Sequence, residues 1–231
     1  MQVPTLTELA LKKLENLILE GTLCPGDRIN LEELSRTFTM SPTPFREALN
    51  RLERERLVTY RPRAGWTVAQ VSREEFFQSY EMQELLETTM TVRAMEKLDG
   101  DDLDRLAEWN REMRLRHGRW DGLGVIEANL AFHKVIYDRY PNAIMRRTLE
   151  QVWKATHLER RWVMIQDTVE CVPRLMDEHD DLIKALSQRD EAAVRGVMAR
   201  HFRTGEESFK VYFDRLGMET EEGEEEREGR L

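Results

Sequence analysis

Apolar residues near the N-terminus recur at helical spacing. Between Leu6 and Leu19 they fall close to one helical face, and Gly21 follows as a stop signal. After a proline–glycine turn, Asn30 with Glu33 three residues later forms a capping-box-like start to a second, short helix. The pattern therefore predicts two helices joined by a tight connection.

A third helix is predicted to begin at about Pro42, because proline is favoured at the first helical position. Its apolar residues Phe45, Leu49 and Leu52 lie at i, i+4 and i+7 and are expected to point inward. Arg46 is left on a more exposed side, where it can contact a partner.

The pattern then changes from helical spacing to strand character. Residues 57–60 and 66–71 are expected to be two strands, and residues 61–65 form a tight basic turn between them. Three helices followed by a hairpin predict a winged helix-turn-helix domain over residues 1–71.

No strand signal follows Ser72, and the rest of the chain is predicted to be helical. The expected helices span about residues 73–97, 101–116, 120–138, 142–165, 171–187 and 190–214. These elements predict an antiparallel all-α bundle over residues 72–216 and, with the first domain, a mainly α fold. Residues 217–231 hold seven glutamates against two arginines, so we expect an acidic disordered tail.

Charge is unevenly distributed along the chain. The formal net charge is −9, yet residues 36–63 hold seven arginines against three glutamates. Such a basic stretch can bind phosphate whatever the total charge. The two cysteines are far apart, and there is neither a run of roughly 18 apolar residues nor a signal-peptide pattern. We therefore expect a cytoplasmic protein that does not associate with membranes.

In a helix-turn-helix the second helix lies in the major groove of DNA, so the third helix here needs polar side chains at its outer edge. Ser41 and Thr43 are placed to reach phosphate or base edges, and Arg46 can form paired hydrogen bonds with a guanine. Arginines in the hairpin turn can bind flanking phosphate. The candidate DNA contacts are Arg36, Ser41, Thr43, Arg46, Arg61, Arg63 and Gly65.

The stretch GTLCPGDRINLEELSRTFTMSPTPFREALNRLERERLVTYRPRAGWTV resembles the GntR family of bacterial regulators, and the resemblance covers residues 6–71. Its most specific parts are PGDRI, SPTPFREALNRL and RAGW. It implies that Thr43 and Arg46 contact DNA and that Gly65 lies at the wing tip. Pro42 replaces a common arginine and Glu32 a common basic residue, so an unusual operator sequence is expected.

Three of the five histidines, His133, His179 and His201, lie on apolar helical faces. Buried imidazoles need polar partners, and one shared divalent metal ion would satisfy all three. Asn129, one turn before His133, would add an oxygen ligand on the same face. The alternative is that each histidine is a core residue hydrogen-bonded to a carbonyl group.

Residues 73–213 resemble the helical C-terminal domain of the FadR-type branch of GntR regulators. The similar segments are YEMQELLETTMTVRAMEKL, NLAFHKVIYDRYPNAIM, DEHDDLIKALSQRDEAAV and MARHF. In metal-binding members of that branch an aspartate and three histidines hold a divalent cation, often zinc or nickel, beside a small carboxylate effector. The resemblance places His133, His179 and His201 at the three histidine positions.

Two departures from that branch affect the predicted ligands. Asn129 stands where the aspartate would be and brings no charge, so weaker metal binding is expected. Gln83 stands where many relatives have an arginine, which weakens the case for a carboxylate effector. Gln83 and Asn142 are the candidate effector-binding residues.

These features predict a homodimeric transcriptional regulator, and we expect a repressor whose binding to operator DNA is modulated by a small organic acid at or near the metal. One alternative is an architectural DNA-binding dimer with no metal and no effector. A metal-dependent enzyme is a remote alternative, because no HExxH motif, paired ExxH ligands or nucleophile constellation occurs.

Overall fold

The computed structural model describes residues 4–19, 22–54, 57–70, 72–156, 159, 163 and 171–215. The chain forms two compact units, Met1–Val71 and Ser72–Leu231. Each unit contains its own buried apolar residues.

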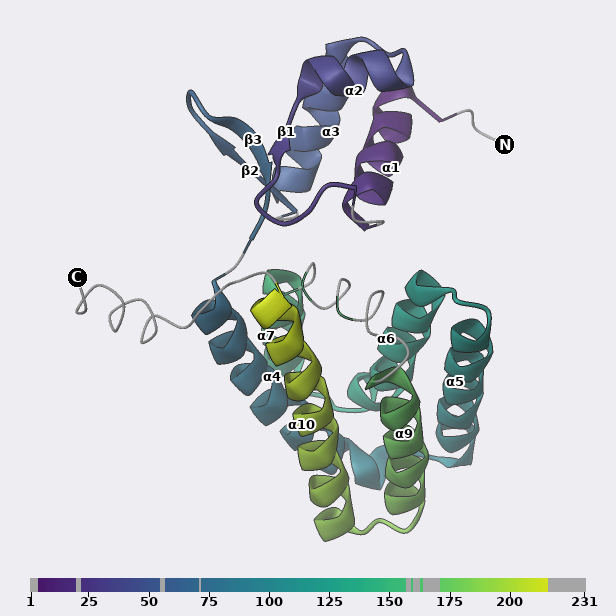
Figure 1. Ribbon diagram of the computed structural model, residues 1–231. Helices are drawn as coiled ribbons and strands as arrows, with labels where there is room; N and C mark the ends of the chain where they lie inside the picture. Colours follow the sequence, from purple (N-terminus) through teal and green to yellow (C-terminus); the bar gives the residue numbers. More distant parts are fainter. Residues whose placement is uncertain are drawn as a thin grey trace, which may run out of the picture. The chain divides into compact units, whose positions relative to one another are not determined.

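The N-terminal unit consists of three helices and a small sheet (Figure 1). Helix α1 packs on α3, and the side chains between them are almost fully buried. Phe45, Leu49 and Leu52 point inward as their spacing predicts, and each is 0% exposed. The elements are α1 (Leu6–Leu19), β1 (Arg28–Ile29), α2 (Leu31–Phe38), α3 (Pro42–Arg54), β2 (Val58–Arg61) and β3 (Gly65–Val68).

The sheet is antiparallel, in the order β1-β3-β2. The hairpin of β2 and β3 is the predicted wing. Arg61 lies opposite Gly65, and between them Arg63 adopts a φ of 69° while Gly65 has a φ of 85°. Glycine reaches this left-handed region without a steric penalty, which explains its place at the turn. The two-residue strand β1 was not predicted from the sequence, because it is too short to produce an alternating pattern.

The C-terminal unit is a bundle of helices (Figure 1). Helix α5 packs against α6 and α9, α10 packs against α9 and α4, and α7 packs against α4. Capping boxes at Ser72 and Asp99 begin α4 and α5. The elements are α4 (Arg73–Ala94), the 3₁₀ turn η1 (Met95–Lys97), α5 (Gly100–Gly118), α6 (Gly122–Asp138), α7 (Ala143–Ala155), α9 (Cys171–Ser187) and α10 (Glu191–Arg215).

The predicted fold class, a winged helix-turn-helix domain followed by an all-helical domain, is confirmed. The predicted helix over 142–165 is wrong in its extent, because α7 ends at Ala155. Thr156 has φ −112° and ψ 14°, outside the helical region, and neither proline nor glycine marks this end in the sequence. The predicted acidic tail, 217–231, lies outside the described residues. Within the described part of the chain, no helix is both long and apolar enough to cross a bilayer.

Candidate DNA interface and candidate metal centre

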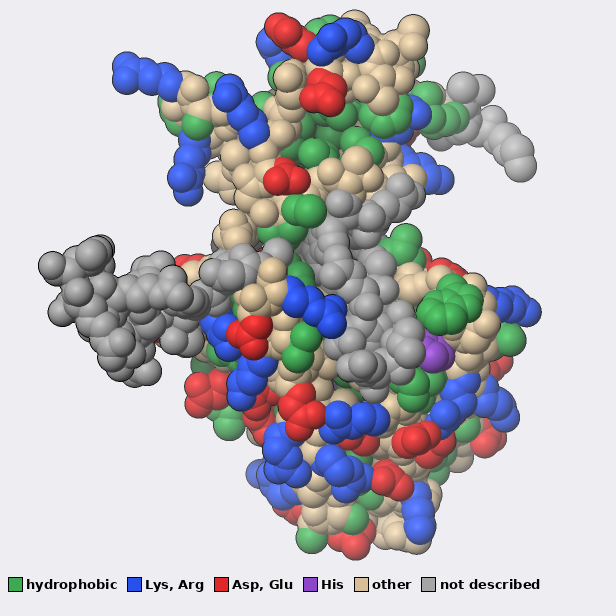
Figure 2. Space-filling model, viewed as in Figure 1, with side chains coloured by type: hydrophobic (Ala, Val, Ile, Leu, Met, Phe, Trp, Pro, Cys, Tyr) green, Lys and Arg blue, Asp and Glu red, His purple; other side chains and the backbone are tan. Residues whose placement is uncertain are grey.

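Six of the seven residues predicted to contact DNA are solvent-exposed, and Gly65 is half-buried in the wing. Thr43 and Arg46 lie in the first two turns of α3, Ser41 directly precedes that helix, and Arg36 lies in α2. Arginine side chains project from the wing, whereas acidic and basic side chains are interspersed over α9 and α10 (Figure 2). The structure therefore leaves these side chains accessible to a nucleic acid.

A groove separates α3 from the sheet in this unit. Arg28, Arg46, Asn50 and Tyr60 line it, and the Tyr60 ring packs on Trp66 with ring centroids 4.9 Å apart. Three glutamates of α2 and α3 also line the groove, so its lining carries both signs of charge and the two arginines are its basic side chains. Sequence reasoning missed Arg28 and Tyr60, because their place beside Arg46 depends on the pairing of β1 and β2 with β3.

The structure brings the three predicted histidines together from three helices of the C-terminal unit. His133 comes from α6, His179 from α9 and His201 from α10. One nitrogen from each ring lies within 4.8 Å of the others. A tetrahedral zinc ion needs nitrogens roughly 3.4 Å apart, so binding one would draw the three rings closer together.

Three buried polar atoms at this site lack hydrogen-bond partners among the described residues. Both ring nitrogens of His179 and the Oδ1 atom of Asn129 have no hydrogen-bond partner in the described part of the chain. His179 is 0% exposed and stacks on Phe132, with ring centroids 3.9 Å apart. Burial, and then the neighbouring His201 and His133, hold the pKa of His179 well below its ordinary value of 6.5. An unprotonated imidazole and an unpaired amide oxygen fit a divalent metal as ligands.

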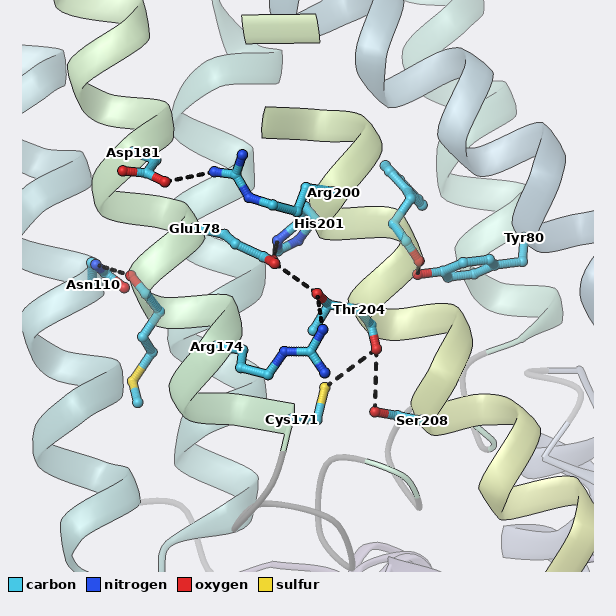
Figure 3. Close-up of polar contacts among 12 residues, drawn as sticks. Tyr80, Asn110, Cys171, Arg174, Glu178, Asp181, Arg200, His201, Thr204 and Ser208 are labelled. Carbon is cyan, nitrogen blue, oxygen red and sulfur yellow. Dashed lines mark hydrogen bonds and ion pairs between the residues drawn. The ribbon is translucent and has the colours of Figure 1, made fainter. Parts of the chain in front are cut away.

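The second ring, His201, is oriented by a carboxylate (Figure 3). Its Nδ1 atom lies 3.2 Å from Oε2 of Glu178, and the other carboxylate oxygen accepts a 2.6 Å hydrogen bond from Thr204. Burial opposes ionisation of Glu178, but the hydrogen bonds from His201 and Thr204 outweigh it and lower the pKa of this carboxyl group. We assign the Nδ1 proton of His201 to this contact, which leaves the Nε2 lone pair for a metal.

The third ring, His133, is linked to a second buried carboxylate. Its Nδ1 atom lies 3.4 Å from the hydroxyl oxygen of Tyr137, and that hydroxyl donates a 2.7 Å hydrogen bond to Glu87. Since the Tyr137 proton points to Glu87, we assign the Nδ1 proton of His133 to Tyr137. This arrangement also directs Nε2 toward a metal.

A cavity of about 80 Å³ adjoins the histidines. Asn129, His133 and His201 line it, and so do the polar side chains of Gln83, Glu87 and Trp153. Gln83 therefore lines this cavity, and its role in effector binding stays a prediction.

Asn142, the other predicted effector-binding residue, is not among the described residues that line this cavity. Its Oδ1 atom accepts hydrogen bonds from the amides of Ile144 and Met145 and caps α7. Asparagine is a favoured residue at such an N-cap. We therefore leave Asn142 out of the candidate site.

Comparison with known proteins assigns a family to each unit. The family described as "Bacterial regulatory proteins, gntR family" matches residues 6–68, and the FCD domain matches residues 78–204. LutR, a transcriptional regulator of Bacillus subtilis, is 26% identical over 217 residues, which are 86% of this chain and 98% of LutR. The transcriptional repressor GlaR of Escherichia coli is 25% identical over 205 residues, 83% of this chain and 90% of GlaR.

A solved structure shares the same fold. The E. coli McbR/YncC structure aligns with a TM-score of 0.70 and 23% sequence identity, over 91% of this chain and 100% of that one. LutR and GlaR are both described as transcriptional regulators. The chain is therefore a transcriptional regulator of the GntR family, in the FadR-type branch that carries an FCD domain.

Proposed function

We propose that this protein is a homodimeric repressor whose operator binding is controlled by a small organic acid bound beside a divalent metal ion. The observation that carries the proposal is the cluster of His133, His179 and His201 around one point, next to a cavity. The same chain exposes arginines on its winged helix, which supports a regulator that combines a sensor site with a DNA-binding unit.

Operator binding is assigned to α3 and the wing. Thr43 and Arg46 contact base edges in the major groove, while Arg36 and Ser41 contact phosphates beside them. Arg61 and Arg63 bind phosphates from the wing, whose turn requires Gly65. Two copies would present two such helices to a palindromic operator, since a symmetric dimer matches a symmetric site. The printed name of GlaR as a repressor supports repression as the mode of action.

Metal binding is assigned to His133, His179, His201 and Asn129. The metal, zinc or nickel, would supply a Lewis-acidic position for an oxygen atom of the effector. Glu178 holds His201 in the tautomer that ligation requires. Asn129 contributes an oxygen but no charge, so the affinity is expected to be lower than with an aspartate.

Control of DNA binding by the effector requires that the effector bind two arrangements of the dimer with unequal affinity. A ligand changes operator binding only if it prefers one arrangement of the dimer over the other. The cavity is built by side chains from several helices, so occupancy can change how those helices pack. We expect the effector to favour the arrangement that does not bind the operator.

Arg46→Ala tests the DNA-binding assignment, with Arg51→Ala as the matched control. Arg51 carries the same charge on the same helix but interacts with Glu8 of α1. Fluorescence anisotropy with the duplex upstream of the protein's own gene should show that Arg46→Ala weakens binding by about 1–3 kcal/mol, or roughly 5- to 150-fold. Arg51→Ala should change it little. Equal binding by wild type and Arg46→Ala would overturn the assignment.

Elemental analysis of the purified protein tests the metal assignment. We expect about one zinc or nickel ion per chain, and a rise of about 2.7 kcal/mol in unfolding free energy at a metal concentration 100 times Kd. If the protein contains no metal and neither metal addition nor chelation changes the thermal midpoint, the architectural dimer becomes the better account.

A further inference from the structure

We infer that the effector carries a positively charged amino group and that Glu87 is the residue that selects it. The inference rests on the proposed function, because it concerns the ligand of the same cavity. Its basis is a buried carboxyl group that lines the cavity, accepts hydrogen bonds from three donors and has no basic partner among the described residues.

Three side chains from three helices hold the Glu87 carboxylate in place. Oε1 accepts hydrogen bonds from Nε2 of Gln83 at 2.6 Å and Nε1 of Trp153 at 2.7 Å, and Oε2 accepts one from the Tyr137 hydroxyl at 2.7 Å. The amide and indole nitrogens can only donate, so these contacts suit an anion. Glu87 is 2% exposed, so its carboxyl oxygens are held in place inside the bundle by these three donors.

The charge of Glu87 has no counter-ion in the described part of the chain. Among the described residues, no basic nitrogen lies within 4.0 Å of the Glu87 carboxyl oxygens, the distance that defines an ion pair. No lysine or arginine is among the described residues that line the cavity. A buried charge without an opposite charge is costly, so a cationic ligand would be favoured beside it. A second anion would be repelled.

The carboxylate also has unused hydrogen-bonding capacity. A carboxylate offers about four lone-pair sites, and the protein occupies three of them at Glu87. The remaining site is on Oε2, and an ammonium N–H can fill it. Gln83, which stands where the resemblance places an arginine, donates to Glu87 and brings no positive charge.

Size narrows the ligand class further. The cavity of about 80 Å³ is about half the volume of one that holds benzene, so the ligand has few non-hydrogen atoms. With its carboxylate at the metal and its ammonium at Glu87, a small amino acid satisfies both ends. A dicarboxylate would place its second negative charge against Glu87.

The experiment compares three probes of similar size on metal-loaded full-length protein: glycine, glycolate and malonate. Glycolate replaces the ammonium by a hydroxyl group, and malonate replaces it by a second carboxylate. Calorimetry should show glycine binding wild type about 10- to 100-fold more tightly than either acid. Glu87→Gln should weaken glycine binding by a similar factor and should tighten malonate binding. Misfolding would not produce tighter binding.

Glu84→Gln is the matched control, because Glu84 lies on the same helix and is not among the described residues that line the cavity. It should leave all three affinities unchanged. The inference is overturned if glycine fails to bind wild type more tightly than glycolate and malonate, or if Glu87→Gln leaves glycine binding intact. If glycolate and malonate bind at least as tightly as glycine, only this inference fails. If chelation of the metal changes no affinity, the proposed function fails with it.

Discussion

Replacing His179 with leucine should make the metal-free protein more stable and should abolish its stabilisation by metal. His179 is 0% exposed, and neither of its nitrogens has a hydrogen-bond partner in the described residues. An unsatisfied buried polar group costs about 1–3 kcal/mol, so two such nitrogens make the metal-free ring destabilising. Leucine removes both nitrogens and keeps an apolar contact with Phe132, at the loss of a ring stack of about 0.5–1.5 kcal/mol. The two unsatisfied nitrogens outweigh the lost ring stack, so we expect metal-free His179→Leu to be more stable than wild type by roughly 0.5–5 kcal/mol.

The same substitution should reduce the pH dependence of the unfolding free energy of the metal-free protein. Burial keeps the pKa of His179 well below 6.5 in the folded chain, so the unfolded chain binds the extra proton first as pH falls. The metal-free wild type should therefore lose stability below about pH 6.5, with a slope of up to about 1.4 kcal/mol per pH unit from this group. His179→Leu should lack this component.

Urea unfolding of chelator-treated protein at pH 7.5 and pH 5.5 measures both effects, and thermal midpoints with added zinc measure the metal response. His179→Leu should show no zinc-dependent rise, while His117→Gln, a histidine change outside the cluster, should behave as wild type. The reasoning is refuted if metal-free His179→Leu is clearly less stable than wild type, or if its response to zinc is complete.

Three other substitutions test single contacts. Asn129→Asp adds a charged oxygen ligand and should tighten zinc binding by about tenfold in calorimetry, whereas equal or weaker binding would remove Asn129 from the site. Glu178→Gln should weaken zinc binding by about 10- to 100-fold. In ¹⁵N NMR of the metal-free protein it should also shift His201 away from the Nδ1–H tautomer, and an unchanged tautomer would refute the role of Glu178 in orienting His201. Asp181→Asn, on the same helix, is its control. Gly65→Ala should cost about 1–2 kcal/mol of unfolding free energy at a φ of 85°, and a neutral result would contradict the turn geometry.

Periodicity and capping residues predicted most of the fold. Asn30 caps α2, and the helix predicted over 171–187 is α9 (Cys171–Ser187). The sequence did not predict the end of α7 at Ala155, because only backbone geometry marks it. It also did not predict β1, whose two residues become a strand only by pairing with β3.

The histidines of the candidate site were identifiable because an imidazole on an apolar helical face is chemically unusual. Glu87 and Glu178 were missed because their proposed functions depend on partners from other helices, which local sequence spacing does not reveal. Trp153, for example, is 66 residues from Glu87 in the chain. Pairings at such separations follow from helix packing and not from local spacing.

Selection of binding sites from a pool of random DNA duplexes, with the full-length protein, tests the central claim most directly. The account predicts enrichment of an inverted repeat whose half-sites lie about 10 base pairs apart, or a multiple of that, because two copies of α3 enter successive major grooves. Enrichment should disappear with Arg46→Ala. No enrichment by wild type, or the same enriched sequence from Arg46→Ala, would contradict operator binding through α3.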